Sequence, residues 1–127
     1  MKVSFDNSKP IYLQLMDYFY QQICNGTINP GQKLPSVRET AVEAGVNPNT
    51  VQRTYAEMER SGIVEAKRGQ GSFVTVDETI IKQLRETISE QYVTTFVVYM
   101  QNNGFSETEI IEQVKTALER SRGEENG

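Results

Sequence analysis

Apolar positions along residues 10–25 recur at helical spacing and predict a helix that is apolar on almost every side. One stripe consists of Tyr12, Leu15, Phe19 and Ile23, and a second of Leu13, Tyr20 and Cys24. A helix of this kind usually packs against two partners. We expect one partner to be the helices that follow it, and the other to be the C-terminal segment or a second subunit.

Two shorter helix signatures follow, each opened by its own cap. Ser36 and Glu39 form a capping box that predicts a short helix ending near Gly45, where glycine can take the left-handed conformation of a C-cap. Asn47 before Pro48 predicts the next start, because proline at the first helical position loses no hydrogen bond. This helix should end near residue 61. Its core side carries Val51, Tyr55 and Met58, and its opposite side carries Asn49, Arg53, Ala56 and Arg60.

Residues 63–67 and 72–76 are rich in β-branched and aromatic residues and predict two strands joined by Arg68-Gly69-Gln70-Gly71. The glycines permit positive φ at the tip and a close approach of the backbone to another molecule. Lys67 and Arg68 add positive charge there. Helix, turn, helix and glycine-tipped hairpin is the layout of a winged helix-turn-helix, a module that usually reads duplex DNA.

The remainder of the chain predicts two amphipathic helices and no pocket chemistry. The first should run to about Asn103, and its apolar stripe is Ile81, Leu84, Ile88, Tyr92, Phe96 and Tyr99. A capping box formed by Ser106 and Glu109 opens a second helix of around fifteen residues, striped by Ile110, Val114, Ala117 and Leu118. The residues from Arg122 to Gly127 are expected to fray.

The expected fold class is mostly α with a small β-hairpin. We expect a winged helix-turn-helix DNA-binding domain over residues 1–76 and a two-helix dimerisation tail over residues 77–127. The tail is too short to bury its own apolar faces, so a second copy should cover them. The residues assigned to this dimer interface are Leu84, Ile88, Tyr92, Phe96, Tyr99, Met100, Ile110, Val114 and Leu118. The alternative is a hairpin folded back on the monomer's own first helix.

Composition argues against an enzyme. The 127 residues contain no histidine, which excludes histidine-based acid–base catalysis and the common zinc sites. We therefore expect no catalytic residue, metal or cofactor. Cys24 cannot form an internal disulfide, the Met-Lys start does not resemble a signal peptide, and no apolar run approaches ~20 residues. These features predict a cytoplasmic protein without a membrane partner.

The charge is distributed unevenly along the chain, whose net charge is −4. Residues 1–76 carry eight Lys and Arg against seven Asp and Glu, which gives +1, and residues 77–127 carry five against ten, which gives −5. The first part can therefore approach phosphates more readily than the second.

Asn49 and Arg53 lie one turn apart near the N-terminal end of the helix that starts at Pro48. Asparagine can pair with adenine and arginine with guanine in the major groove, each contact contributing roughly 1–3 kcal/mol of discrimination. The alternative is an ordinary solvated face. The charged, glycine-tipped hairpin favours DNA recognition.

The stretch from residue 28 to residue 76 resembles the DNA-binding domain of the GntR family of bacterial transcription regulators. The segments that carry the resemblance are Pro30-Gly31, Leu34-Pro35-Ser36-Val37-Arg38-Glu39, Gly45-Val46-Asn47-Pro48-Asn49-Thr50-Val51-Gln52-Arg53 and Gly69-Gln70-Gly71-Ser72-Phe73-Val74, with Pro10-Ile11-Tyr12 at the entry helix. The short remainder is similar to the YtrA-type subfamily, which has a two-helix tail in place of a large effector domain.

The resemblance implies which residues contact DNA. In the family these are the arginine after Leu-Pro-Ser, the first turns of the second helix of the motif, and the tip of the hairpin. The corresponding residues here are Arg38, Asn47, Asn49, Thr50, Arg53, Gly69 and Gln70, and the charges of Lys67 and Arg68 complete the predicted set. Many members have an arginine or a serine-arginine pair where this chain has Asn47-Pro48, so base preference does not transfer.

We therefore expect a sequence-specific DNA-binding regulator, acting as a repressor. A two-fold homodimer would bind a near-palindromic operator whose half-sites lie about one DNA turn, ~34 Å, apart. Regulators of this family commonly respond to a small molecule, so the resemblance also implies a small-molecule effector, whose identity is unknown. The alternative function is a winged-helix protein–protein adaptor that does not bind DNA.

Overall fold

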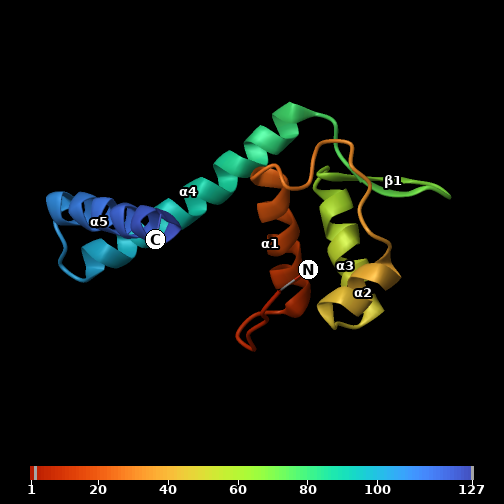
Figure 1. Ribbon diagram of the computed structural model, residues 1–127, viewed down its shortest axis with the longest axis horizontal. Coiled ribbons are helices and arrows are strands. Elements are labelled where there is room, and N and C mark those ends of the chain that lie inside the picture. Colours follow the sequence, from red (N-terminus) through yellow and green to blue (C-terminus); the bar gives the residue numbers. More distant parts are fainter. Residues whose placement is uncertain (2, 127) are drawn as a thin grey trace. The chain divides into compact units, whose positions relative to one another are not determined.

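The chain divides into two compact units, Met1–Glu86 and Thr87–Gly127, of which the structure, a computed structural model, describes residues 1 and 3–126. The first unit contains α1 (Ile11–Cys24), α2 (Val37–Ala44), α3 (Pro48–Arg60), β1 (Val64–Lys67) and β2 (Gly71–Val74). A long helix, α4 (Glu78–Asn102), begins in the first unit and ends in the second, where α5 (Glu107–Asn126) follows (Figure 1). The predicted class, mostly α with a winged helix-turn-helix, is confirmed.

The turn between α2 and α3 is built by the caps that the sequence predicts. Ser36 Oγ accepts a hydrogen bond from the Glu39 N–H at 3.1 Å, and the Glu39 carboxylate accepts one from the Ser36 N–H at 3.2 Å. Gly45 ends α2 with a φ of 67°. The Asn47 side chain then caps α3 by accepting from the Asn49 N–H at 2.8 Å. The angle between the two helices is thus set by local hydrogen bonds.

The strands β1 and β2 form an antiparallel hairpin, called the wing below, in which Lys67 is opposite Gly71. Both strands are shorter than the predicted ranges 63–67 and 72–76. Gly71, which we expected in the turn, pairs within the ladder because the turn needs only residues 68–70.

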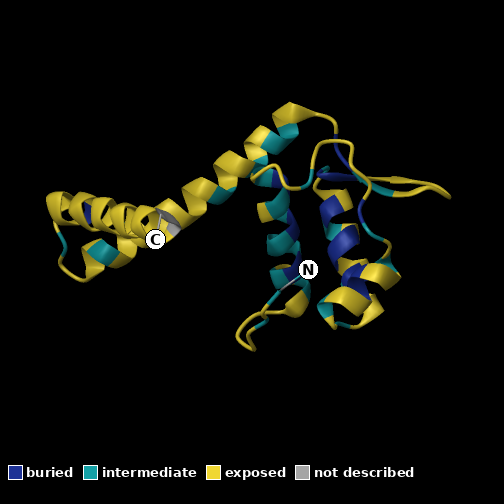
Figure 2. Ribbon diagram, in the orientation of Figure 1, coloured by how far each residue is buried: buried dark blue, intermediate teal, exposed yellow. Residues whose placement is uncertain are grey.

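The core of the first unit joins all of its elements. Its buried apolar residues are Leu15, Phe19, Ile23, Leu34, Ala41, Val51, Tyr55, Met58, Ile63, Val64 and Val74. Figure 2 shows buried residues along both α1 and α3. The wheel predicted for α3 is confirmed, since Asn49, Arg53, Ala56 and Arg60 are all exposed. The second stripe of α1 is less covered, and its Leu13 is 38% exposed.

The Tyr55 hydroxyl links α3 to the start of α2. It donates a hydrogen bond to the Pro35 carbonyl at 2.7 Å and accepts one from Thr40 Oγ1 at 2.8 Å. Thr40 is fully buried, so its hydroxyl has no water to replace this partner. Tyr55 therefore fixes α2 relative to α3 as well as filling the core.

We expect Tyr55→Phe to destabilise the protein by about 1–3 kcal/mol, because it leaves a buried hydroxyl and carbonyl without a partner. Urea unfolding followed by circular dichroism measures the loss. Tyr20→Phe is a matched control: it removes an exposed hydrogen bond of 3.0 Å to Ser61 Oγ, which water can replace. Equal losses in the two variants would show that the Tyr55 hydrogen bonds stabilise the protein no more than an exposed hydrogen bond does.

The start of α4 belongs to the first unit. Ile80, Ile81 and Leu84 pack against its core, and the division between the units falls after Glu86 rather than at the end of the wing. Leu84, which we expected at the dimer interface, is thus placed on the N-terminal core. The apolar stripe is continuous along α4, so the sequence did not indicate that only its first turns pack against the N-terminal core.

In the second unit, α5 is opened by reciprocal hydrogen bonds between Ser106 and Glu109 at 3.2 and 3.0 Å. It has 20 residues and reaches Asn126, so the residues from Arg122 onward that we expected to fray are helical, and Gly127 lies outside the described residues. A single glycine at position 123 is too weak a breaker to end the helix. Across the described residues, no helix is long and apolar enough to cross a membrane.

Candidate nucleic-acid interface

The first two turns of α3 present three of the residues that the sequence analysis assigned to DNA contact. Asn49 and Arg53 are exposed and Thr50 is partly buried. With Ile11 and Tyr12 of α1 they line an open recess of about 300 Å³, called the α1–α3 recess below. The N-terminal turn of α1 therefore contributes to the same surface as α3.

Arg53 is held by an aromatic ring. Its guanidinium lies over Tyr12, with 3.7 Å between Cζ and the ring centroid. The Thr54 hydroxyl donates to the carbonyl oxygens of Tyr12, at 3.0 Å, and Thr50, at 3.1 Å, which ties α3 to the start of α1. Sequence reasoning placed Tyr12 in a core stripe and missed this contact, because the periodicity of one helix does not show what it meets on another.

Two other predicted contacts sit at helix starts. Arg38 is exposed in the first turn of α2. Asn47 is exposed as well, but its side-chain carbonyl is used to cap α3. The cap leaves both donors of the Asn47 amide NH₂ available for a contact with another molecule.

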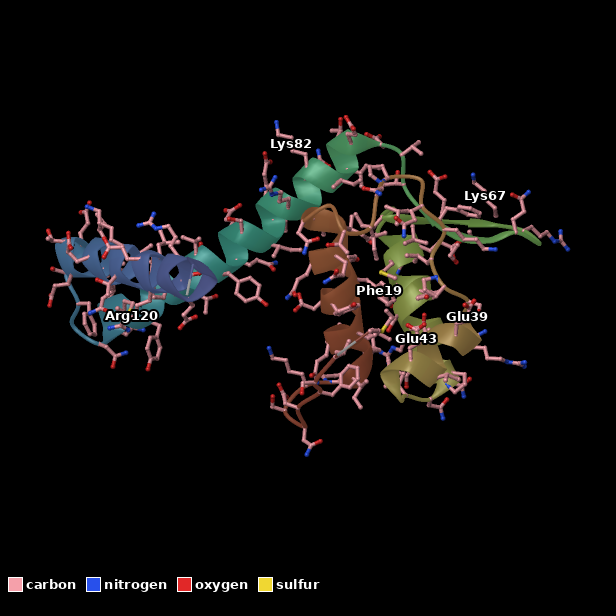
Figure 3. The ribbon with its side chains drawn as sticks, viewed as in Figure 1. Phe19, Glu39, Glu43, Lys67, Lys82 and Arg120 are labelled. Atoms are coloured by element: carbon pink, nitrogen blue, oxygen red, sulfur yellow. The ribbon has the colours of Figure 1, made fainter. Side chains whose placement is uncertain are left out.

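The wing tip carries the remaining predicted contacts, Lys67, Arg68, Gly69 and Gln70, all exposed. Its turn is closed by a hydrogen bond of 2.8 Å from the Gln70 N–H to the Lys67 carbonyl, with Gly69 at a φ of 76°. The Lys67 ammonium lies 4.6 Å from the centroid of the Phe73 ring, and Figure 3 labels Lys67 on the wing. An exposed, positively charged tip can follow a phosphate backbone.

Lys33 adds a cation to the wing that the sequence analysis did not select. It precedes α2 and forms a β-bridge with Phe73. Its Cε lies 2.9 Å from the position that a Cβ on Gly71 would take. Only the pairing of this segment with β2 brings Lys33 to the wing, and no local sequence pattern predicts that pairing.

We expect Gly71→Ala to destabilise the wing by about 1–3 kcal/mol, because Gly71 has a φ of 119°, which residues with a Cβ rarely adopt. The added methyl group would also displace the Lys33 side chain. Hydrogen exchange of the β1 and β2 amides, measured by NMR, should report the loss. Gly104→Ala, at a φ of 84° with open space around it, is the control for left-handed strain without the contact. Unchanged wing protection in Gly71→Ala would contradict the prediction.

Two groups of the first unit with shifted pKa values, Glu39 and Cys24, have structural roles. Hydrogen bonds from the Ser36 backbone N–H and hydroxyl lower the pKa of the Glu39 carboxyl, which keeps it charged and bound to the start of α2. Burial raises the pKa of the Cys24 thiol, as expected for a packing residue rather than a nucleophile. No three His, Cys, Asp or Glu side chains in the described part of the chain are grouped to hold a metal ion.

The second unit has an apolar groove of about 580 Å³ between α4 and α5, called the tail groove below. It is lined by Phe96, Met100, Gln113, Val114, Ala117 and Leu118. Four of the predicted interface residues thus lie together, and Tyr92 and Tyr99 are exposed nearby in sequence on α4. Ile88 is partly buried, while Ile110 is only 9% exposed and belongs to the interior of the tail.

A helix-turn-helix with an exposed second helix and a cationic wing defines the class: a winged-helix domain of the type found in DNA-binding regulators. The chain belongs to the gntR family of bacterial regulatory proteins, whose family model matches residues 11–74.

Two relatives from Bacillus subtilis support this assignment. The chain is 44% identical over 119 residues to the uncharacterized HTH-type transcriptional regulator YhcF, covering 94% of this chain and 98% of that protein. It is 40% identical over 87 residues to the HTH-type transcriptional repressor YtrA, covering 67% of each chain. The resemblance to YtrA-type members is confirmed, and the relatives are regulators rather than enzymes.

Solved structures show the same fold. A GntR family transcriptional regulator from Listeria monocytogenes has a TM-score of 0.86 at 43% identity, covering 88% of this chain and 98% of that one. The DNA-binding domain of AraR, in complex with operator ORX1, has a TM-score of 0.56 at 26% identity, covering 59% of this chain and 96% of that one. A domain of this fold is therefore seen on operator DNA.

Proposed function

We propose that this gntR-family regulator binds a near-palindromic operator as a homodimer, reads it through α3 and represses transcription. The observation that carries the proposal is the exposed pair Asn49 and Arg53, on a helix whose other side is buried in the core. These side-chain types make the bidentate contacts by which adenine and guanine are recognised in the major groove. The operator complex of the AraR domain supports the same use of the fold.

Each predicted contact has a role in this proposal. Arg53 and Asn49 read base edges, Thr50 and Arg38 position the protein on phosphates, and the amide of Asn47 adds a hydrogen bond at the start of α3. The wing, with Lys67, Arg68, Gly69 and Gln70 at its tip, follows the adjacent groove. Phosphate contacts fix register and orientation, and base contacts provide specificity.

The proposed dimer is formed by the tail. The tail groove and its neighbours expose large apolar side chains in a single chain, including Tyr92 at 62%, Tyr99 at 66% and Leu118 at 58%. A second copy is the partner that covers such faces symmetrically. Two DNA-binding units joined in this way bind two half-sites more tightly than one unit binds one, because the second contact becomes intramolecular.

The remaining parts of the proposal follow from DNA recognition by the first unit and dimerisation by the tail. Residues 1–76 bind DNA and residues 77–127 form the dimerising tail, in which the interface lies on α5 and on the part of α4 after Glu86. Repression is supported by the likeness to YtrA, an HTH-type transcriptional repressor, and by the obstruction of RNA polymerase that a protein bound at a promoter causes. Access to bacterial DNA requires a cytoplasmic location. The tail groove, at the proposed dimer interface, has a volume within the range of ligand sites and is the place where a small-molecule effector would bind.

The test is selection of bound duplexes from a random DNA pool at two salt concentrations, followed by sequencing. We expect an inverted repeat with half-site centres about ten base pairs apart. Enrichment should weaken at the higher salt concentration, because phosphate contacts release counterions. Enrichment of no sequence would overturn the proposal and leave the adaptor function. Enrichment of a single half-site would retain DNA binding and overturn the dimeric arrangement.

A further inference from the structure

The contact that holds Arg53 is a ring face rather than a carboxylate. Cζ lies 3.7 Å from the centroid of the Tyr12 ring, and among the described side chains no carboxylate forms a salt bridge with Arg53. A guanidinium carries its five N–H donors in its plane, so stacking through the face leaves them free. A carboxylate would have used those donors itself. Arg53 is thus restrained while its donors stay available.

The backbone that carries Tyr12 is held at two points. From α3, the buried Thr54 donates to the Tyr12 carbonyl at 3.0 Å. From the segment before α1, the Gln14 amide donates to the carbonyl oxygens of Asp6, at 2.8 Å, and Lys9, at 2.9 Å. The second pair of hydrogen bonds holds the chain where it enters α1. The backbone from which the Tyr12 ring projects is therefore fixed against α3, and the ring itself lies against Arg53.

We propose that Tyr12 is a positioning residue that sets the base preference of α3 by orienting the Arg53 guanidinium. The inference rests on the proposed function, because it takes Arg53 as a base-reading residue. A freely rotating arginine loses side-chain entropy when it makes a bidentate contact, and an arginine already stacked loses less. A stacked arginine also points its N–H donors in one direction. A base whose acceptors lie in that direction therefore gains more binding free energy than the other bases.

The position of the α1–α3 recess supports this role over simple packing. Tyr12 is only partly buried, and it lines the recess together with Asn49, Thr50 and Arg53. A purely structural tyrosine in α1 would contact the core alone. Here the ring lies on the surface that would meet the base edges.

The experiment compares five proteins on the duplex enriched by wild type and on duplexes with each base pair of a half-site replaced. They are wild type, Tyr12→Phe, Tyr12→Leu, Arg53→Ala and the double variant Tyr12→Leu/Arg53→Ala. Tyr12→Phe keeps the ring and should bind as wild type does. Tyr12→Leu should bind roughly 4- to 25-fold more weakly, about 2- to 5-fold for each half-site, and lose preference mainly at the base pair read by Arg53. In the Arg53→Ala background it should have no further effect.

Three outcomes separate the inference from the proposed function. A Tyr12→Leu protein with wild-type preference at that base pair overturns the inference alone. Equal weakening by Tyr12→Leu with and without the Arg53 side chain also overturns it, because Tyr12 would then act only through packing. A wild-type protein that enriches no duplex overturns the proposed function, and the inference fails with it.

A measurement on the free protein does not depend on DNA. Protons on Arg53 Cδ should show an upfield ring-current shift by NMR in wild type and Tyr12→Phe, and lose it in Tyr12→Leu. Its absence from wild type would overturn the inference. Thermal unfolding checks that each variant is folded, and Tyr12→Met, with a flexible apolar side chain, replaces Tyr12→Leu if the latter unfolds.

Discussion

The Leu118→Asp protein is expected to be a monomer that binds the operator about 10²- to 10⁴-fold more weakly than wild type, because it loses the avidity of two linked half-site contacts. Leu118 lines the tail groove with Phe96 and Val114, and its side chain is 58% exposed in a single chain. An aspartate there would have to be buried without a counter-charge in the proposed interface, which costs several kcal/mol. Within one chain it stays hydrated, so the helices should remain folded.

Thr116→Asp provides the matched control for this prediction. It introduces the same charge on the same helix, about 200° around the axis from Leu118, and Thr116 is exposed. Light scattering after size-exclusion chromatography gives the mass, and DNA titration gives the affinity. We expect the control to remain dimeric. A dimeric Leu118→Asp, or a wild-type monomer at the concentration that saturates the operator, would contradict dimerisation through the tail groove.

Arg53→Ala is expected to lower affinity for the operator by about 30- to 10⁴-fold. The estimate takes roughly 1–3 kcal/mol for one bidentate arginine contact, counts one in each of two half-sites, and converts at ~1.4 kcal/mol per tenfold change. The loss should fall on one base pair of each half-site, where the variant accepts all four bases. Competition titrations with singly substituted duplexes measure it position by position.

Arg60→Ala is the control for charge. Arg60 is exposed on the same side of α3, two turns further along, and forms a salt bridge with Glu57. Its removal should change affinity little and preference not at all. If Arg53→Ala instead weakens binding equally for every sequence, Arg53 contacts a phosphate and base reading must be sought elsewhere on α3.

The parts of this fold that the sequence predicts well are those held by hydrogen bonds between residues that are close in sequence. The capping box at Ser36, the left-handed end of α2 at Gly45 and the cap at Asn47 all depend on residues within four positions of one another. These short-range hydrogen bonds define the helix-turn-helix. The two glycines of the wing act in the same way, since the conformation that each requires excludes most other residues.

The parts that sequence did not predict depend on contacts between distant segments. Tyr12 of α1 contacts Arg53 of α3, and Lys33 lies at the wing only because its segment pairs with Phe73. Leu84 continues the apolar stripe of α4, but it packs against the N-terminal core, unlike the later residues of that stripe. In each case the residue type fits more than one environment. The deciding information is where another element lies, and periodicity within a single helix does not contain it.

The cap at the start of α3 has a consequence for the evolution of operator recognition. The side-chain carbonyl of Asn47 accepts a hydrogen bond from the Asn49 N–H. Replacing Asn47 by a residue unable to cap would therefore cost about 1 kcal/mol of stability, in addition to any effect on DNA binding. The Asn49 side chain does not cap the helix in this way. Duplicated copies of this regulator would therefore diverge toward new operators more readily through position 49 than through position 47, where the accessible replacements are serine, threonine and aspartate.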